Sequence, residues 1–118
     1  CDCVKDRHKI YNREFRDKKS AEFYKSKEWK TLTAICKTKA NGLDLYEYVL
    51  NNNIVKGELS HHIEEITDNK SRTLDIGNLI WISNKTHNYI HSQYNKSAKD
   101  KKEIQNKLFE ILNIWYSN

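Results

Sequence analysis

The sequence predicts an α+β fold in which an antiparallel hairpin and the helix that follows it are surrounded by further helices. The segment 54–63, which alternates in the manner of a strand, and the continuous apolar run 79–82 flank a polar stretch and are typical of paired strands. The segment after them spaces His87 and His91 by four residues, which is a helical interval. A last segment, 97–116, carries an apolar stripe of helical period.

The N-terminal third is predicted to be helical. Residues 1–19 form a basic extension in which we expect a helix over 4–19. Ser26 can cap a helix that continues to Lys39, and Asn41-Gly42 can end it. Its buried face is expected to hold the apolar residues that recur at helical spacing, namely Trp29, Leu32, Ile35 and Cys36.

A short helix and the first strand should come next. The helix is expected over 43–50, with the asparagines of 51–53 as the turn after it. Its apolar side would hold Leu43, Tyr46, Val49 and Leu50. In the strand within 54–63, alternation places His61 on one face, with Leu59 and Ile63, and His62 on the opposite face.

The segment 64–77 is polar and irregular, and loops of that length in compact domains are usually functional. The apolar run 79–82 then reads as a second strand, antiparallel to the first. Asn84 can cap a helix over 85–94.

A final helix should follow, because Ser97 and Asp100 resemble a capping box. It would extend to Trp115, and its apolar stripe would hold Ile104, Leu108, Ile111, Leu112 and Trp115. We expect Trp81 and Trp115 to belong to the core.

Four of the five histidines form two tight pairs, at 61–62 and 87/91, with Asn78 between them. His87 and His91 would project from one helix face and can chelate a single ion. Only one member of the first pair can join that ion, because adjacent strand residues face opposite ways. The other is then placed to take a proton from water.

This pattern resembles the HNH endonucleases, whose core is a ββα-metal motif, and especially the bacterial toxin nucleases that also begin with a His-His pair. The likeness lies in "ELSHHIEEI" and "LDIGNLIWISNKTHNYIH", across 58–95. "SAEFYKSKEWKTL" looks like the leader helix of phage members, which extends the likeness to 20–95.

The resemblance implies a role for each residue of the pattern. His61, His87 and His91 would bind one metal ion, and His62 would be the general base. Asn78 would brace the long loop and keep the base oriented. For Glu64 and Glu65, which follow the base directly, solvation is favoured over a role in catalysis. His8 is expected to be an ordinary packed or hydrogen-bonded side chain.

The cysteines depart from the phage pattern. Many phage members hold a second, structural zinc in two CxxC pairs, and at the corresponding positions this chain has Tyr46, Val49, Ser83 and Thr86. We therefore expect a packed core in place of that zinc.

The cysteines that the chain does have are interpreted separately. Cys36 is expected to be a buried thiol. Cys1 and Cys3 could end a truncated zinc ribbon, since the chain begins without methionine and further sequence is expected upstream, but two thiolates alone do not make a zinc site.

Charge and length bound the function. The net charge of +5 is unevenly distributed: residues 1–39 hold twelve basic and six acidic residues, 40–83 three and seven, and 84–118 six and three. Basic flanks around an acidic, metal-recruiting centre suit a phosphodiester substrate.

At 118 residues, one domain is expected. Because the sequence has no long apolar run and no signal peptide, we expect no membrane partner and a cytoplasmic location, in the host cell if the protein is phage-encoded.

We therefore predict a metal-dependent DNA endonuclease. Three imidazoles favour Zn, Ni or Co over Mg, although substrate phosphate and water can complete a site for Mg or Mn. Two alternatives remain open. One is a non-catalytic zinc protein that binds DNA, in which a fourth protein ligand closes the site. The other is a nuclease that acts mainly with the phage terminase in DNA packaging, which rests on the resemblance alone.

Overall fold

The computed structural model describes residues 22–117 of the chain. These divide into two compact units, with the boundary between Thr31 and Leu32 inside helix α2 (Lys27–Lys39). The prediction of a single domain is not tested by this division. The expected helix over 4–19, His8, Cys1 and Cys3 lie outside the described residues.

The described part of the first unit is a short aromatic turn. Residues 22–25 are helical, and Ser26 caps α2 by accepting a hydrogen bond from the backbone N–H of Trp29 at 3.2 Å, as predicted. The ring of Trp29 lies 5.3 Å from those of Phe23 and Tyr24. α2 ends at Lys39, and in the turn after it Asn41 and Gly42 both take positive φ.

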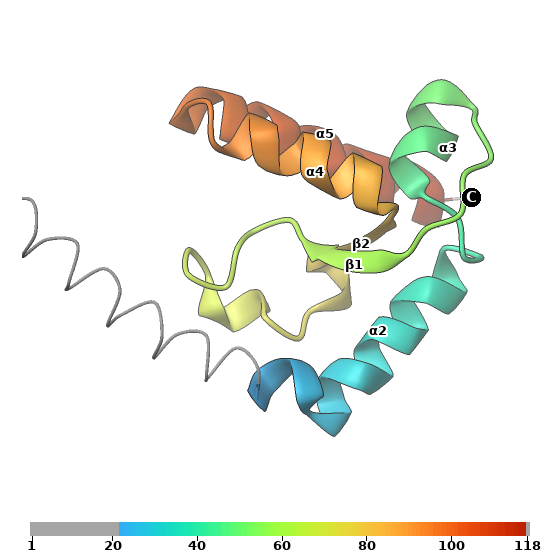
Figure 1. Ribbon diagram of the computed structural model, residues 1–118, viewed down its shortest axis with the longest axis vertical. Helices are drawn as coiled ribbons and strands as arrows, with labels where there is room; N and C mark the ends of the chain where they lie inside the picture. Colours follow the sequence, from blue (N-terminus) through green and yellow to red (C-terminus); the bar gives the residue numbers. More distant parts are fainter. Residues whose placement is uncertain (1–21, 118) are drawn as a thin grey trace, which may run out of the picture. The chain divides into compact units, whose positions relative to one another are not determined.

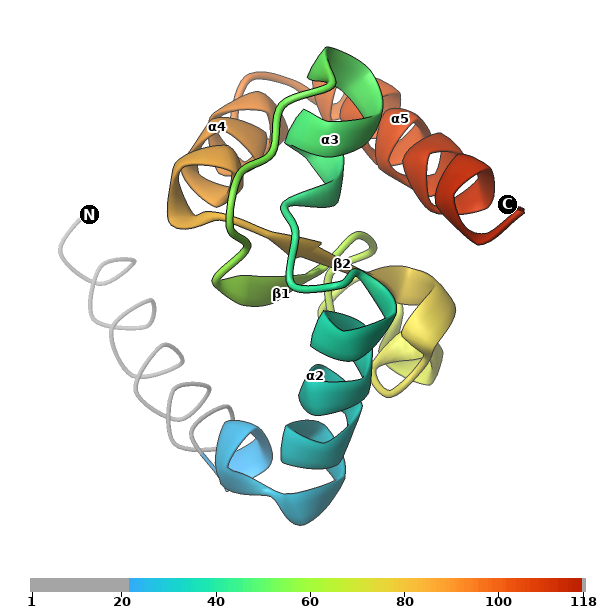
Figure 2. The ribbon, with the colours of Figure 1, turned by 90° about the vertical axis from the view of Figure 1, so that its right-hand side faces the viewer.

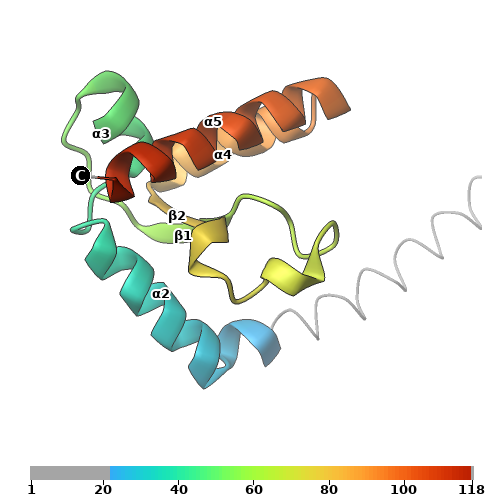
Figure 3. The same cartoon turned by 180° about the vertical axis from the view of Figure 1, so that it is seen from behind.

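The second unit is built on a hairpin followed by a helix, which confirms the predicted α+β class. β1 (Leu59–His62) pairs antiparallel with β2 (Leu79–Ile82), so that His61 lies opposite Ile80 and His62 opposite Leu79. α4 (Asn84–Tyr94) follows β2 directly. α5 (Ala98–Tyr116) runs back alongside α4, as Figures 1 and 3 show.

α3 (Leu45–Asn51) packs against both α5 and β2 (Figure 2). The core is formed by buried residues of α3, β2, α4 and α5, namely Leu45, Leu79, Ile80, Ile82, Ile90, Leu108, Ile111 and Leu112. Among the described helices, none is both long and apolar enough to cross a bilayer.

The polar segment between the strands is a loop, as expected, but it contains two short 3-10 turns, η1 (Lys70–Arg72) and η2 (Ile76–Asn78). η2 begins at Asp75, whose carboxylate accepts a hydrogen bond from the backbone N–H of Gly77. Asn78 is the last residue of η2, and it therefore lies directly before the first residue of β2.

Two predicted helix starts are wrong by one or two residues. α4 is capped by Ser83, whose hydroxyl accepts from the backbone N–H of Thr86, and Asn84 is the first helical residue. α3 begins after Asp44, which caps it through the backbone N–H of Glu47.

The later start of α3 changes its buried face. Leu43 lies before the helix, in an isolated bridge with Lys56, and Leu45 is the fully buried residue. Leu50 and, on α2, Ile35 are exposed, contrary to the prediction. Trp115 is half-buried at the end of α5, where its Nε1 donates to the Lys39 carbonyl, whereas Trp81 is buried as expected.

Asp44 ties the starts of α3 and α4 together. Its buried carboxylate accepts from the hydroxyls of Ser83 (2.8 Å) and Thr86 (2.6 Å) and from the Ser83 backbone N–H. By the predicted resemblance, Ser83 and Thr86 correspond to two of the zinc-binding cysteines of many phage members. At this position the expected packed core contains a buried carboxylate, and its several hydrogen-bond donors offset the cost of burying it.

Candidate metal centre and general base

Three histidines from two elements meet beside the hairpin. His61 is on β1, and His87 and His91 lie one turn apart on α4. One potential ligand atom from each lies within 4.8 Å of the others. The Nε2 atoms of His87 and His91 are 2.9 Å apart. Two nitrogens that bind one tetrahedral ion at about 2.0–2.1 Å are roughly 3.3 Å apart, so this pair is already close to ligand geometry.

The cluster is open on one side. His61 is only 4% exposed, whereas His87 and His91 are half-buried. Burial and the neighbouring imidazoles lower the pKa of His61 to about 3, and burial followed by the charge of His91 lowers the pKa of His87. Neutral imidazoles are the form that binds metal. The donor set therefore fits a divalent ion with coordination positions left for water or substrate.

His62 is held apart from the cluster by the long loop. Its Nε2 lies 2.9 Å from the backbone carbonyl of Thr73. A carbonyl can only accept, so Nε2 carries the proton and the lone pair resides on Nδ1. Burial lowers the pKa of His62, and the hydrogen bond to Thr73 offsets part of that effect. The ring is close enough to His61 to lower the pKa of that residue.

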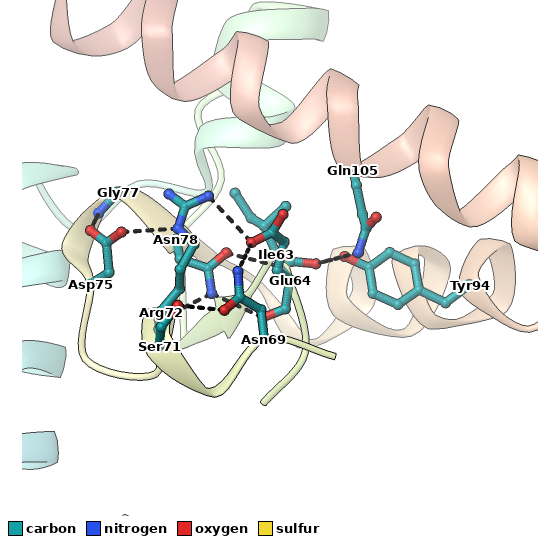
Figure 4. Close-up of polar contacts among 10 residues, drawn as sticks. All are labelled: Ile63, Glu64, Asn69, Ser71, Arg72, Asp75, Gly77, Asn78, Tyr94 and Gln105. Atoms are coloured by element: carbon teal, nitrogen blue, oxygen red, sulfur yellow. Dashed lines mark hydrogen bonds and ion pairs between the residues drawn. The ribbon is translucent and has the colours of Figure 1, made fainter. Parts of the chain in front are cut away.

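The side chain of Asn78 connects the start of the loop, at Glu64, with Arg72 within it (Figure 4). It is fully buried, and its Oδ1 accepts from the backbone N–H of Glu64 at 2.8 Å. Its Nδ2 donates to the carbonyls of Glu64 (2.9 Å) and Arg72 (3.2 Å). Since Arg72 precedes Thr73, the amide of Asn78 fixes the backbone that in turn fixes His62.

Charged side chains hold the same loop from outside. Arg72 pairs with Glu64 at 3.4 Å and with Asp75 at 2.9 Å. Lys101 of α5 pairs with Glu65 at 3.1 Å and with Asp68 at 2.7 Å. Glu64 and Glu65 are thus engaged in loop contacts, and neither belongs to the possible metal group found among residues 22–117.

Sequence reasoning missed Tyr94. Its hydroxyl lies 3.1 Å from Nε2 of His61 and donates to the carbonyl of Ile63 at 2.6 Å. Gln105 of α5 donates to the same carbonyl at 2.9 Å. The spacing held a signal: Tyr94 follows His87 by seven residues and His91 by three, so all three share one face of α4. Thr73 carries no such signal, since the loop has no period.

The chain is similar in structure to a bacteriophage protein. No family model matches it, and no curated protein matches its sequence. A similar solved structure is the crystal structure of the deep-sea thermophilic bacteriophage GVE2 HNH endonuclease with manganese ion, at 26% identity and a TM-score of 0.60. The match covers 80% of this chain and 96% of the phage chain.

The chain has the fold and the histidine cluster of an HNH endonuclease. This confirms the predicted resemblance and the ββα architecture, with β1 and β2 as the hairpin and α4 as the helix. It also agrees with one divalent ion as cofactor. The individual roles of His61, His62, Asn78, His87 and His91 remain predictions.

Proposed function

We propose that the chain is a metal-dependent DNA endonuclease that hydrolyses phosphodiester bonds with one metal ion and a histidine base. One observation carries the proposal: three imidazoles converge within 4.8 Å, while the next residue along β1, His62, is held by the loop instead. The structural likeness to a phage HNH endonuclease that was crystallised with manganese supports a nuclease and a divalent ion.

His61, His87 and His91 would hold the ion. When bound, it would supply positive charge that stabilises the negative charge developing on the scissile phosphate and the leaving 3′ oxygen. Among the described residues the cluster has no fourth protein ligand. An open position favours a catalytic site over the closed, structural zinc site of the alternative hypothesis.

His62 would be the general base. Its pKa is lowered by burial, so the imidazole is neutral at physiological pH and Nδ1 can take a proton from water. The water oxygen attacks phosphorus, the bond from phosphorus to the 3′ oxygen breaks, and that oxygen leaves and gains a proton. The products are 5′-phosphate and 3′-hydroxyl ends. A positioned base is typically worth about 10²–10⁴ in rate.

The substrate would be bound mainly through its phosphates. The first 31 residues hold ten basic and six acidic residues, whereas residues 32–118 hold eleven and ten. The excess of positive charge is therefore concentrated in the part of the sequence that precedes the unit carrying the histidines. Phosphate neutralisation with counterion release suits such a distribution and gives little sequence specificity.

A phage role belongs to the same proposal and rests on the likeness to a phage protein. The chain would act in the host cytoplasm, and cooperation with the terminase during genome packaging is the more specific form. Cleavage that rises when the purified terminase is added supports that form. Cleavage that terminase leaves unchanged contradicts it without affecting the nuclease assignment.

A plasmid-cleavage assay tests the proposed activity. The protein should convert supercoiled DNA only with a divalent ion from the panel Zn, Ni, Co, Mn and Mg, and a chelator should stop it. The products should be joined again by DNA ligase, because ligation needs a 5′-phosphate and a 3′-hydroxyl. Ser60→Ala, which alters a neighbouring β1 residue that bonds Thr33, serves as control and should keep full activity.

A further inference from the structure

The buried phenol of Tyr94 joins the metal cluster to the core. Tyr94 is only 7% exposed at the end of α4, and its hydroxyl lies between Nε2 of His61 and the carbonyl of Ile63. The ring also lies under the ammonium group of Lys101, 5.4 Å from its centroid. Its position is thus fixed on the ring face as well as at the hydroxyl.

The hydroxyl of Tyr94 has a single proton, which it donates to the carbonyl of Ile63. The Tyr94 oxygen is 2.6 Å from the Ile63 carbonyl, which can only accept, and 3.1 Å from Nε2 of His61. With its proton committed to the shorter bond, the hydroxyl can only accept from His61. Nε2 of His61 therefore carries a proton, and the lone pair of that ring is on Nδ1.

We infer that Tyr94 is a positioning residue that fixes the tautomer and orientation of His61 for metal binding through Nδ1. The inference rests on the proposed function, because it assigns a role within the same metal site. Metal-bound histidines almost always donate their second N–H to a fixed acceptor, which sets the ring and increases ligand basicity. Here the acceptor is a phenol oxygen that is itself held by the backbone of the residue two positions after His61.

Gln105 provides a matched control, as Figure 4 makes visible: Tyr94 from α4 and Gln105 from α5 converge on the carbonyl of Ile63. Tyr94→Phe and Gln105→Met each remove one of the two donors to that carbonyl. Each variant leaves it one hydrogen bond and keeps the side-chain bulk. Only Tyr94→Phe removes the partner of His61.

Metal titration of the parent and both variants tests the inference, with manganese or zinc and a chromophoric competitor. Tyr94→Phe should weaken metal binding by about 10-fold or more, the range typical of lost outer partners of a ligand. Gln105→Met should bind as the parent does, although both variants should melt at a lower temperature. Equal affinities for the two variants would overturn the inference, because Tyr94 would then act only through the Ile63 backbone.

A second readout needs no variant and no metal. Long-range proton–nitrogen NMR of the metal-free parent should show His61 with its proton on Nε2, and a proton on Nδ1 instead would overturn the inference. If the parent takes up no metal at all, the proposed function fails together with the positioning role. If the parent binds metal and Tyr94→Phe binds it equally well, only the positioning role fails.

Discussion

Nε2 of His62 donates to the backbone carbonyl of Thr73, eleven residues further along the chain, at 2.9 Å. The bond makes the orientation of the proposed base depend on a loop that has little regular structure of its own. The side chain of Asn78, which follows the loop, bonds Glu64 at its start and Arg72 within it.

Asn78→Ala should therefore lower the rate of cleavage while leaving the metal affinity close to that of the parent. It removes three hydrogen bonds of a fully buried amide, and each backbone group left unsatisfied costs about 1–3 kcal/mol. Thermal melting, metal titration and single-turnover cleavage measure the three effects. Asn69→Ala is the control, since it removes side-chain bonds to Glu64 and Ser71 in the same loop but leaves every bond of Asn78 in place. An Asn78→Ala protein that cleaves as fast as this control contradicts the bracing role.

Calorimetry should show about one equivalent of divalent ion bound by the parent. Affinity should fall as the pH is lowered because the imidazoles must be neutral to bind, and the lowered pKa values of His61 and His87 should place this loss at a more acidic pH than for free imidazoles. His87→Ala/His91→Ala removes two of the three converging groups and should abolish this uptake. Undiminished uptake by the double variant would rule out the site. Circular dichroism should show that the variant keeps the helix content of the parent, because the two substituted side chains are only half-buried.

The metal-free protein should lose stability as the pH falls from about 6.5 towards 3. Burial lowers the pKa of His61 from 6.5 to about 3 in the folded state, so between these values the unfolded chain binds more protons. The free energy of unfolding then rises with pH through this window and is unaffected by His61 above it. Urea unfolding between pH 7 and 4 measures the slope, which should be shallower in His61→Gln. Equal slopes would contradict the burial of a neutral imidazole.

Affinity for duplex DNA should fall steeply between low and moderate salt, and should change little with sequence. Phosphate contacts by the basic residues release counterions, and each contact adds about 0.9 to the slope of log affinity against log salt. Fluorescence anisotropy with two unrelated duplexes measures both properties. A flat response would indicate a partner other than nucleic acid.

The parts of the site that follow from local periodicity were predicted from the sequence. The interval between His87 and His91 specifies one helix face whatever surrounds it. The alternation around residue 59 and the apolar run at 79–82 predict the two strands of the hairpin. Capping at Ser26 and Ser97 was confirmed for the same reason, since a cap bonds to an amide three residues away.

The missed features depend on contacts between residues distant in sequence. Asp44 bonds residues about forty positions away, and this explains why Ser83 rather than Asn84 caps α4. His61 on β1 meets Tyr94 on α4 across 33 residues, so the contact depends on how β1 pairs with β2 and how α4 packs on α5. Loop 64–77 takes its shape from Asn78, Arg72 and Lys101, none of which leaves a periodic pattern.

The paired variants His61→Ala and His62→Ala, measured for metal affinity and for single-turnover cleavage, separate the two histidines that lie next to each other on β1. His62→Ala should keep the parent's metal affinity and lose at least about 10²-fold in cleavage rate, the smallest effect expected of a general base. His61→Ala should lose both metal affinity and cleavage. Loss of the ion from His62→Ala, with the ion retained by His61→Ala, would reverse the two roles and contradict the proposed mechanism.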